Sequence, residues 1–174
     1  VYDRLLDGLG EFLTELRPAA ALFLSFEGID YDADPEAGPK LDRLIRAAQA
    51  VLARYGGTLL QLTIGDKGSY CYAAFGAPVS YEDNARRAMA AALELRALPS
   101  ELRFLSPLRI GVSEGIMRAG AYGAATRRTY GVLGDEVNLA ARLMQLAGPG
   151  EILASGRVRD QLSAAFVWEA LPPV

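Results

Sequence analysis

Apolar side chains recur along this chain with the periods of strands and helices. Residues 19–29 form a short apolar run between Pro18 and Gly28, which is typical of a buried strand. Apolar positions at helical spacing predict helices over residues 3–16, ended by Pro18, and over residues 40–55. The other predicted elements are strands over residues 58–64, 69–76, 108–117, 119–124, 129–133, 151–154 and 165–170, and helices over residues 81–97, from 135 onward and over 156–162.

The order of these elements predicts the fold class. Strand, helix, two strands, helix and strand in succession are typical of an α+β fold with a ferredoxin-like βαββαβ core, here followed by a C-terminal strand-helix extension. Two helices should cover one face of an antiparallel sheet and leave the other face or an edge for a partner. We expect residues 1–18 to be a linker helix, residues 19–174 to form one domain, and the acidic segment 30–39 to be a solvated loop.

Composition and charge narrow the possible chemistry. The chain has 174 residues, a net charge of −3, no histidine and one cysteine, Cys71. A slightly acidic chain with scattered arginines is not expected to bind nucleic acid. Because histidine is absent, His-based catalytic triads and His-ligated zinc are excluded, and a metal ion would need oxygen ligands. The single cysteine fits the reducing cytoplasm, and no apolar run reaches the length of a membrane span.

The segment from Arg127 to Leu143 carries the most distinctive polar pair. A loop containing Gly134 runs into a helix that begins at Asp135, and Asn138 and Arg142 lie four residues apart on that helix. They therefore project from the same face, one turn apart. An amide and a guanidinium so placed suit a substrate with oxygen atoms to bind. The alternative is an ordinary solvated polar pair.

Five short segments occur in a fixed order along the chain. They are LFLSFEGI at 22–29, TIGD at 63–66, AFGAP at 74–78, RIGV at 109–112 with glycines at 115, 120 and 123, and YGVLGDEVNLAAR at 130–142. Together they resemble the class III adenylyl/guanylyl cyclase catalytic domain, over about residues 19–174. The turn at residues 66–68 and the strand after it are most similar to the second cyclase half of bicarbonate-regulated soluble adenylyl cyclases.

This resemblance implies an active site between two cyclase domains, where two aspartates hold two divalent ions, Mg²⁺ or Mn²⁺. Asn138 and Arg142 match the pair that orients the ribose and stabilises the transition state. Asp66 matches the second metal aspartate. The first metal position falls at Ser25, and Glu27, on the same strand face, is a remote substitute. The metal ions are therefore expected to be held mainly by the partner half.

The resemblance also locates the positions that contact the purine and the phosphates. The purine-reading lysine would fall at Leu62 or, with a shift of one residue, at Gln61, and its acidic or threonine partner would fall at Gly131. Gln61 could hydrogen-bond a purine edge, whereas Gly131 offers only its backbone. Arg127 and Arg128 are candidate phosphate contacts, with a solvated loop as the alternative. A further phosphate-binding lysine would follow Val174, so the domain is expected to be truncated at its C-terminus.

A chain that keeps the Asn/Arg pair but lacks the first metal aspartate has the pattern of the second-type half of a heterodimeric cyclase. We expect it to make a cyclic nucleotide for intracellular signalling from ATP, with GTP as the alternative substrate. Its partner would be a first-type domain upstream in the same polypeptide, and a homodimer of the isolated domain should be inactive or weak. The alternatives are a catalytically dead regulatory module that binds nucleotide or only a partner domain, and a ferredoxin-like interaction domain without nucleotide chemistry.

Overall fold

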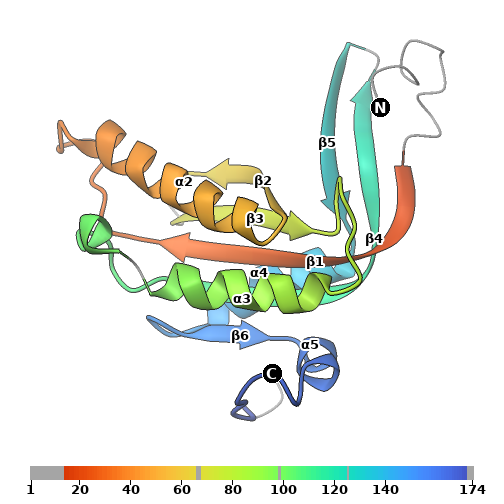
Figure 1. Cartoon of the computed structure of the whole chain (residues 1–174). Coiled ribbons are helices and arrows are strands. Elements are labelled where there is room, and N and C mark those ends of the chain that lie inside the picture. Colours follow the sequence, from red (N-terminus) through yellow and green to blue (C-terminus); the bar gives the residue numbers. More distant parts are fainter. Residues whose placement is uncertain (1–13, 66–67, 98, 125, 172–174) are drawn as a thin grey trace.

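The computed structural model describes residues 14–171 apart from residues 66–67, 98 and 125. Its strands form a mixed sheet in the order β2-β3-β1-β4-β5, with β6 paired in parallel to β4. Figure 1 shows β1 at the middle of this sheet and the β4–β5 hairpin projecting from it as an arm. The elements are β1 (Thr14–Phe26), α2 (Ala37–Arg54), β2 (Gly57–Thr63), β3 (Ser69–Phe75), α3 (Asn84–Arg96), the 3-10 turn η2 (Ser100–Leu102), β4 (Arg109–Ala124), β5 (Arg127–Leu133), α4 (Asp135–Leu146), β6 (Ile152–Ala154) and α5 (Gly156–Gln161).

The predicted ferredoxin-like core is confirmed in β1-α2-β2-β3-α3-β4, whose strands pair antiparallel. Successive side chains of β1 point to opposite faces of the sheet. Leu22 and Leu24 pack in one core with α2 and α3, and Phe23 packs in a second core with α4. Because both faces of the middle of β1 are covered, residues 19–24 form a continuous apolar run without polar alternation.

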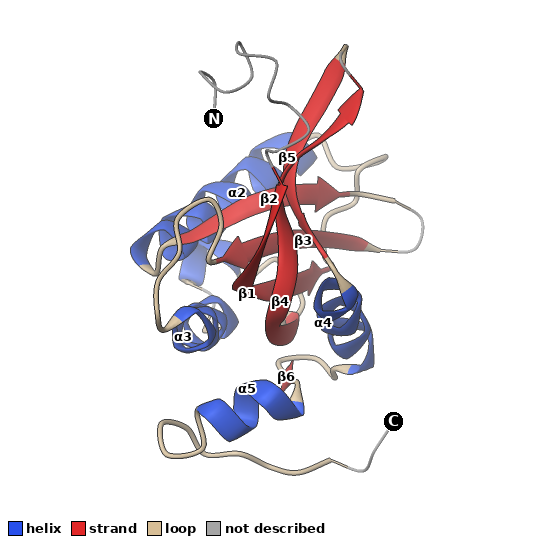
Figure 2. Cartoon of the chain, turned by 90° about the vertical axis from the view of Figure 1, so that its right-hand side faces the viewer, coloured by secondary structure: helices blue, strands red, loops and turns tan. Residues whose placement is uncertain are grey.

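The second face of the sheet is less open than the sequence led us to expect. Helix α4 lies on the side opposite α2 and α3, as Figure 2 shows, and buries Ala140 and Met144 against β1 and β4. A Cβ atom on Gly111 of β4 would lie 2.1 Å from the Ala140 carbonyl oxygen and 2.3 Å from the Met144 amide nitrogen. The helix backbone therefore rests directly on the strand, in space that any other residue would fill.

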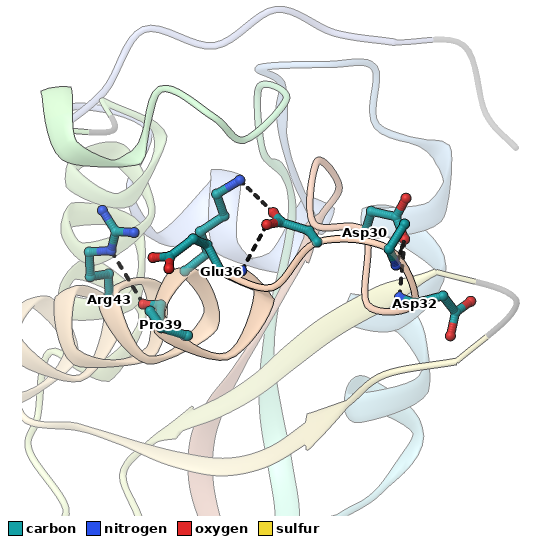
Figure 3. Close-up of polar contacts among 8 residues, drawn as sticks. Asp30, Asp32, Glu36, Pro39 and Arg43 are labelled. Carbon is teal, nitrogen blue, oxygen red and sulfur yellow. Dashed lines mark hydrogen bonds and ion pairs between the residues drawn. The ribbon is translucent and has the colours of Figure 1, made fainter.

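The acidic segment 30–39 is an ordered approach to α2, shown in Figure 3. The Asp30 carboxylate accepts hydrogen bonds from the amides of Asp32 and Ala33, each at 3.0 Å. Asp34 accepts from the Glu36 amide at 2.8 Å and pairs with Lys40 at 2.6 Å, which lowers the pKa of the Asp34 carboxyl. These carboxylates close turns of the chain, as short acidic side chains commonly do in loops.

The helix predicted over residues 3–16 was wrong in the part that the structure describes. Most of the helix expected over residues 3–16 lies outside the described residues, but Thr14–Leu16 belong to β1, and Pro18 lies within that strand instead of ending a helix. Pro18 is tolerated because this part of β1 has one neighbour: it pairs with Ile116 of β4, whereas pairing with β3 begins at Ala20. Proline lacks an amide donor, and such one-sided positions are where strands accept it.

Two other predicted strands differ in the structure. Residues 108–117 and 119–124 form one continuous strand, β4, because β1 and β5 pair with its two halves in turn. The strand predicted over residues 165–170 is absent, and these residues form turns and coil. Phe166 and Trp168 pack edge to face at 6.0 Å on the core, while Val167 is fully exposed. The alternating burial of these residues therefore reflects packing against α5 and the core, and does not come from pairing with another strand.

A methyl group at position 111 should separate α4 from the sheet. We expect Gly111→Ala to lower the free energy of unfolding by about 3 kcal/mol or more, because the atoms in its way are helix backbone and cannot rotate aside. Gly38→Ala is the matched control, since nothing lies within 4 Å of a Cβ there, and it should change stability by less than about 1 kcal/mol. Urea unfolding measures both, and equal stability of the two variants would contradict the packing argument.

Burial of Glu114 should make stability depend on pH. One carboxylate oxygen of Glu114 is buried without a hydrogen-bond partner among the described residues, and burial raises the pKa of this carboxyl, with Arg157 opposing and Glu136 adding to the rise. The folded protein therefore holds this proton more tightly than the unfolded chain, so stability falls as pH rises through this pKa. Glu114→Gln should raise Tm at pH 7 and less so at pH 4, whereas the exposed Glu82→Gln should show no such difference.

Candidate active site

Helix α4 presents the polar pair that the sequence singled out. The Gly134 carbonyl accepts hydrogen bonds from the amides of Val137 at 3.1 Å and Asn138 at 3.4 Å, which starts the helix. Asn138 and Arg142 are exposed, one turn apart, on the side of α4 that faces away from the buried Ala140. Neither side chain has a hydrogen bond or ion pair with any residue that the structure describes. Both are therefore available to a ligand or a partner.

The first turn of α4 is fixed to β4 by a buried polar contact. The Ser113 hydroxyl, which is fully buried, donates a hydrogen bond to the Glu136 carboxylate. Glu136 and Arg157 both lie against Gly115, where a Cβ would be 2.9 Å from the Glu136 side chain and 2.8 Å from the Arg157 guanidinium. Hydrogen bonds to charged groups stabilise by about 1.5–3 kcal/mol. This contact, two residues before Asn138, sets where the helix begins on the sheet.

The strand register distinguishes the two positions expected for the purine reader. Gln61 lies opposite Tyr72, and Leu62 lies opposite Cys71. Directly opposed residues share a face of the sheet, so Gln61 lies on the α4 face with Tyr72, and Leu62 lies on the face of α2 and α3 with Cys71. Gln61 is exposed and donates a hydrogen bond to Thr63 at 2.9 Å. Of the two, only Gln61 shares the face of Asn138 and Arg142.

Gly131 lies on β5 opposite Gly120, with a tyrosine ring over it. A Cβ on Gly131 would lie 2.7 Å from a ring carbon of Tyr122 and 3.0 Å from its hydroxyl oxygen. On the other side of the strand, the buried Tyr72 hydroxyl donates to the Val132 carbonyl at 3.0 Å, and its ring stacks on Phe23 at 4.6 Å. Burial raises the pKa of Tyr72, so this hydroxyl stays protonated as a donor.

Arg127 and Arg128 do not lie in the loop where they were expected. They are the first two residues of β5, at the far end of the arm from α4, and both are exposed. Six residue steps of extended strand separate Arg127 from Leu133, which is about 20 Å. Within one chain they therefore do not converge with Arg142.

The first metal position lies at the other end of β1. Ser25 is half-buried and opposes Arg109 of β4 and Tyr70 of β3. The exposed Glu27 pairs with Arg109 at 3.5 Å. Ser25, Glu27 and Arg109 line a cavity of about 190 Å³. Its polar lining residues are Ser25, Ser106, Arg109 and Glu27, so the one carboxylate among them is already paired with the arginine.

These residues do not fit a divalent cation by themselves. Magnesium and manganese take several oxygen ligands, usually with negative charge, and here an arginine occupies the one carboxylate. No group of three or more acidic, cysteine or histidine side chains suited to a metal occurs among the described residues. Asp66 lies outside them. Beside it, the Gly68 amide donates to the Gly65 carbonyl at 2.9 Å, which closes the turn between β2 and β3.

Three residues of this site were not singled out from the sequence. Glu136 anchors α4, Arg109 faces Ser25, and Tyr122 covers Gly131. Arg109 stands in a quoted segment, but its neighbour across the sheet depends on the register of β1 with β4. The position of Tyr122 over Gly131 depends on the pairing of β4 with β5.

No helix in the part of the chain that the structure describes is long and apolar enough to cross a membrane.

Sequence comparison shows which known proteins this chain is similar to. The family model for the adenylate and guanylate cyclase catalytic domain matches residues 37–171. Adenylate cyclase type 10 of Homo sapiens is 31% identical over 134 residues, which cover 76% of this chain and 8% of that protein. The chain therefore spans only a small part of this relative's length.

Solved structures give the same result. The adenylyl cyclase CyaB from P. aeruginosa superposes with a TM-score of 0.78 at 25% identity, covering 87% of this chain and 83% of that one. A dimeric guanylyl cyclase domain of the RhoGC fusion protein from the fungus Blastocladiella emersonii superposes with a TM-score of 0.76 at 22% identity, covering 91% and 89%. With its cyclase fold and the matched family model, this chain belongs to the adenylate and guanylate cyclase catalytic-domain family.

Proposed function

We propose that this chain is the second-type half of a class III nucleotidyl cyclase, which converts ATP, with GTP as the alternative substrate, to the 3′,5′-cyclic nucleotide and pyrophosphate. The observation that carries the proposal is the exposed pair Asn138 and Arg142 on a helix whose other side is anchored to the sheet. An amide and a guanidinium carried on an anchored helix, without partners in the described chain, are suited to a substrate that arrives with another domain.

In this reaction the ribose 3′-oxygen bonds to the α-phosphorus, the bond from that phosphorus to the bridging oxygen breaks, and the hydroxyl proton is lost to solvent. Negative charge develops on the α-phosphate and on the leaving pyrophosphate. We assign Arg142 to the phosphate oxygens, because its planar donors match them and its charge opposes theirs. We assign Asn138 to the ribose, since an amide both donates and accepts hydrogen bonds. Gln61, on the same sheet face, is the proposed contact to the purine.

The other half of the active site is proposed to come from a first-type cyclase domain, in the same polypeptide or in a separate chain. That domain would hold the divalent cations, Mg²⁺ or Mn²⁺, because Ser25 and the paired Glu27 do not suit them here. A guanylyl cyclase domain of the same fold forms a dimer described as non-canonical, so domains of this fold do pair, and the pairing proposed here is one such arrangement. A homodimer of this chain would then have little or no activity. The buried, lone Cys71 is consistent with our proposal of a cytoplasmic protein in cyclic-nucleotide signalling.

A regulatory module without turnover is the second candidate. It is favoured by Ser25 at the first metal position, by the absence of a lysine at both Leu62 and Gln61, and by Gly131, where the family has an acidic residue or a threonine. In that case the chain would bind nucleotide or only a first-type domain, and the mixed pair would bind ATP without forming product. Turnover by the mixed pair separates the two candidates.

Removing either member of the α4 pair should abolish most of the turnover. Asn138→Ala and Arg142→Ala, each mixed with a first-type domain, ATP and Mn²⁺, should lower kcat by about 100-fold, because a preorganised transition-state donor is lost. Gln145→Ala, an exposed polar residue on the same helix, is the control and should retain activity. Cyclic nucleotide is measured by chromatography. Wild-type rates in both pair variants would contradict the proposed roles.

Restoring a carboxylate at position 25 should give the isolated chain activity. We expect Ser25→Asp to produce cyclic nucleotide in Mn²⁺ without a partner, at least about 10-fold above the wild-type chain, because it supplies the missing charged oxygen ligand. Ser25→Asn has the same shape without the charge and should stay inactive. If the isolated wild-type chain already turns over as fast as Ser25→Asp, the serine is not the disabling feature, and Glu27→Gln tests the remaining carboxylate.

A further inference from the structure

A cleft of about 1110 Å³ lies apart from the proposed nucleotide site. The loop before α3, the strands β1 and β4, and the helix α5 line it, and Figure 2 shows α3 and α5 next to β4. Glu114, which lines the cleft, lies opposite Ala20 of β1, and Ala20 packs in the core with α2 and α3. Because directly opposed residues share a face of the sheet, Glu114 lies on the face opposite Gln61 and α4.

Hydrogen bonds hold the wall of the cleft between β1 and α3. The buried Asn84 side chain donates to the Pro18 carbonyl at 3.4 Å and accepts from the Tyr81 amide at 3.2 Å. The Arg17 guanidinium donates to the Pro78 carbonyl at 2.9 Å. These contacts join the loop before α3 to β1. The cleft is therefore largely formed before any ligand enters it, as is usual for small-molecule sites.

Carboxylates outnumber positive charges among the residues that line the cleft. Glu82, Glu114 and Asp160 line it, and Arg157 is the positively charged residue of the described lining. Asp160 is paired with Arg159 of α5, whereas Glu82 and Glu114 have no ion pair with any residue that the structure describes. The exposed Arg157 pairs with neither of them. The cleft therefore carries an excess of negative charge.

Glu114 is the group in the cleft that gains most from a bound cation. One of its carboxylate oxygens is shut off from solvent and has no hydrogen-bond partner among the described residues. Such a carboxylate has lost hydration without a replacement, which is costly. The Arg157 guanidinium is exposed to water and bears no such cost. A positive charge beside Glu114 supplies what burial has removed, whereas an anion in the cleft would be repelled by this carboxylate.

We propose that this cleft binds an organic cation, a primary ammonium or guanidinium group carried on a short aliphatic chain. The charged group lies beside Glu114, since a charge-assisted hydrogen bond to a carboxylate is among the stronger polar contacts. The aliphatic chain lies against Pro18 and Ile116, which oppose each other in β1 and β4, and Ile116 is 58% exposed. The exposed Glu82 offers a place for a second positive group.

A metal ion fits the cleft less well than an organic cation. No group of three or more acidic, cysteine or histidine side chains suited to a metal occurs among the described residues, those of the cleft included. Divalent cations need several oxygen ligands at once. An ammonium or guanidinium group needs one carboxylate and a surface for its carbon chain, and the cleft offers both.

Calorimetric titration of the whole chain with agmatine tests the proposal, because agmatine carries a guanidinium and an ammonium on a four-carbon chain. We expect saturable binding at one site, with a Kd of about 1 mM or tighter. 1,4-Butanediol has the same carbon chain without charge and should not bind. Succinate has four carbons with two negative charges and should not bind either.

Three variants locate the bound cation. Glu114→Gln keeps the shape of the side chain but removes its charge, so it should raise the Kd for agmatine at least about 10-fold. Arg157→Gln removes an opposing positive charge and should lower that Kd by about 3-fold. Glu101→Gln is the matched control, the same change at an exposed residue outside the cleft, and should leave the Kd unchanged. Melting curves verify that each variant is folded.

The outcomes separate this proposal from the cyclase function. The proposal is overturned if the folded wild-type chain shows no saturable agmatine binding, or if Glu114→Gln binds agmatine as tightly as the wild type. Saturable binding of succinate that Arg157→Gln weakens would also overturn it, because the cleft would then recognise an anion. Each measurement uses binding and none uses turnover, so either proposal can fail while the other stands.

Discussion

The direct contact between the backbone of α4 and the backbone of β4 is the constraint on which the rest of the site depends. Two glycines on one face of β4, Gly111 and Gly115, leave space that α4 and the Glu136 side chain fill. Close packing transmits small displacements, because such an interior has little free volume. The part of the α4 backbone that carries Asn138 and Arg142 is therefore positioned by residues packed between the helix and the sheet. A helix held less closely would leave these groups unable to keep one geometry through a reaction.

The opposite end of β1 shows what this chain lacks. Ser25 and Arg109 lie opposite each other in neighbouring strands, and the carboxylate that lines the cavity beside them, Glu27, is paired with that arginine. A hydroxyl and a guanidinium are hydrogen-bond donors, whereas a divalent cation needs negatively charged oxygen ligands. The side chains of Asn138 and Arg142 can thus bind anionic oxygens, whereas Ser25 and Arg109 at the other end of β1 do not form a site for a cation. This asymmetry is the physical reason to look for the missing ligands on another domain.

The sequence predicted the elements whose signals are local. The buried run of β1, the helical spacing of α2 and the glycine-to-helix junction at Gly134 each depend on neighbours in the chain. The errors arose where the partner decides the structure: Pro18 is accepted because β1 has one neighbour there, and residues 165–170 alternate without any strand to pair with. For the same reason the roles of Gln61 and Leu62 could not be separated before the register of β2 with β3 was known.

The site residues divide in a way that follows from charge. Arg142 and Asn138, which are proposed to face the phosphates and the ribose, lie on a fixed helix, while Gln61, which is proposed to face the base, is neutral and can both donate and accept. A charged side chain that contacts the base favours binding of one purine and disfavours the other, because the wrong base leaves a desolvated charge unpaired. Neutral readers carry no such penalty. This half would therefore recognise its substrate more through the triphosphate and ribose, which ATP and GTP share, than through the base that distinguishes them.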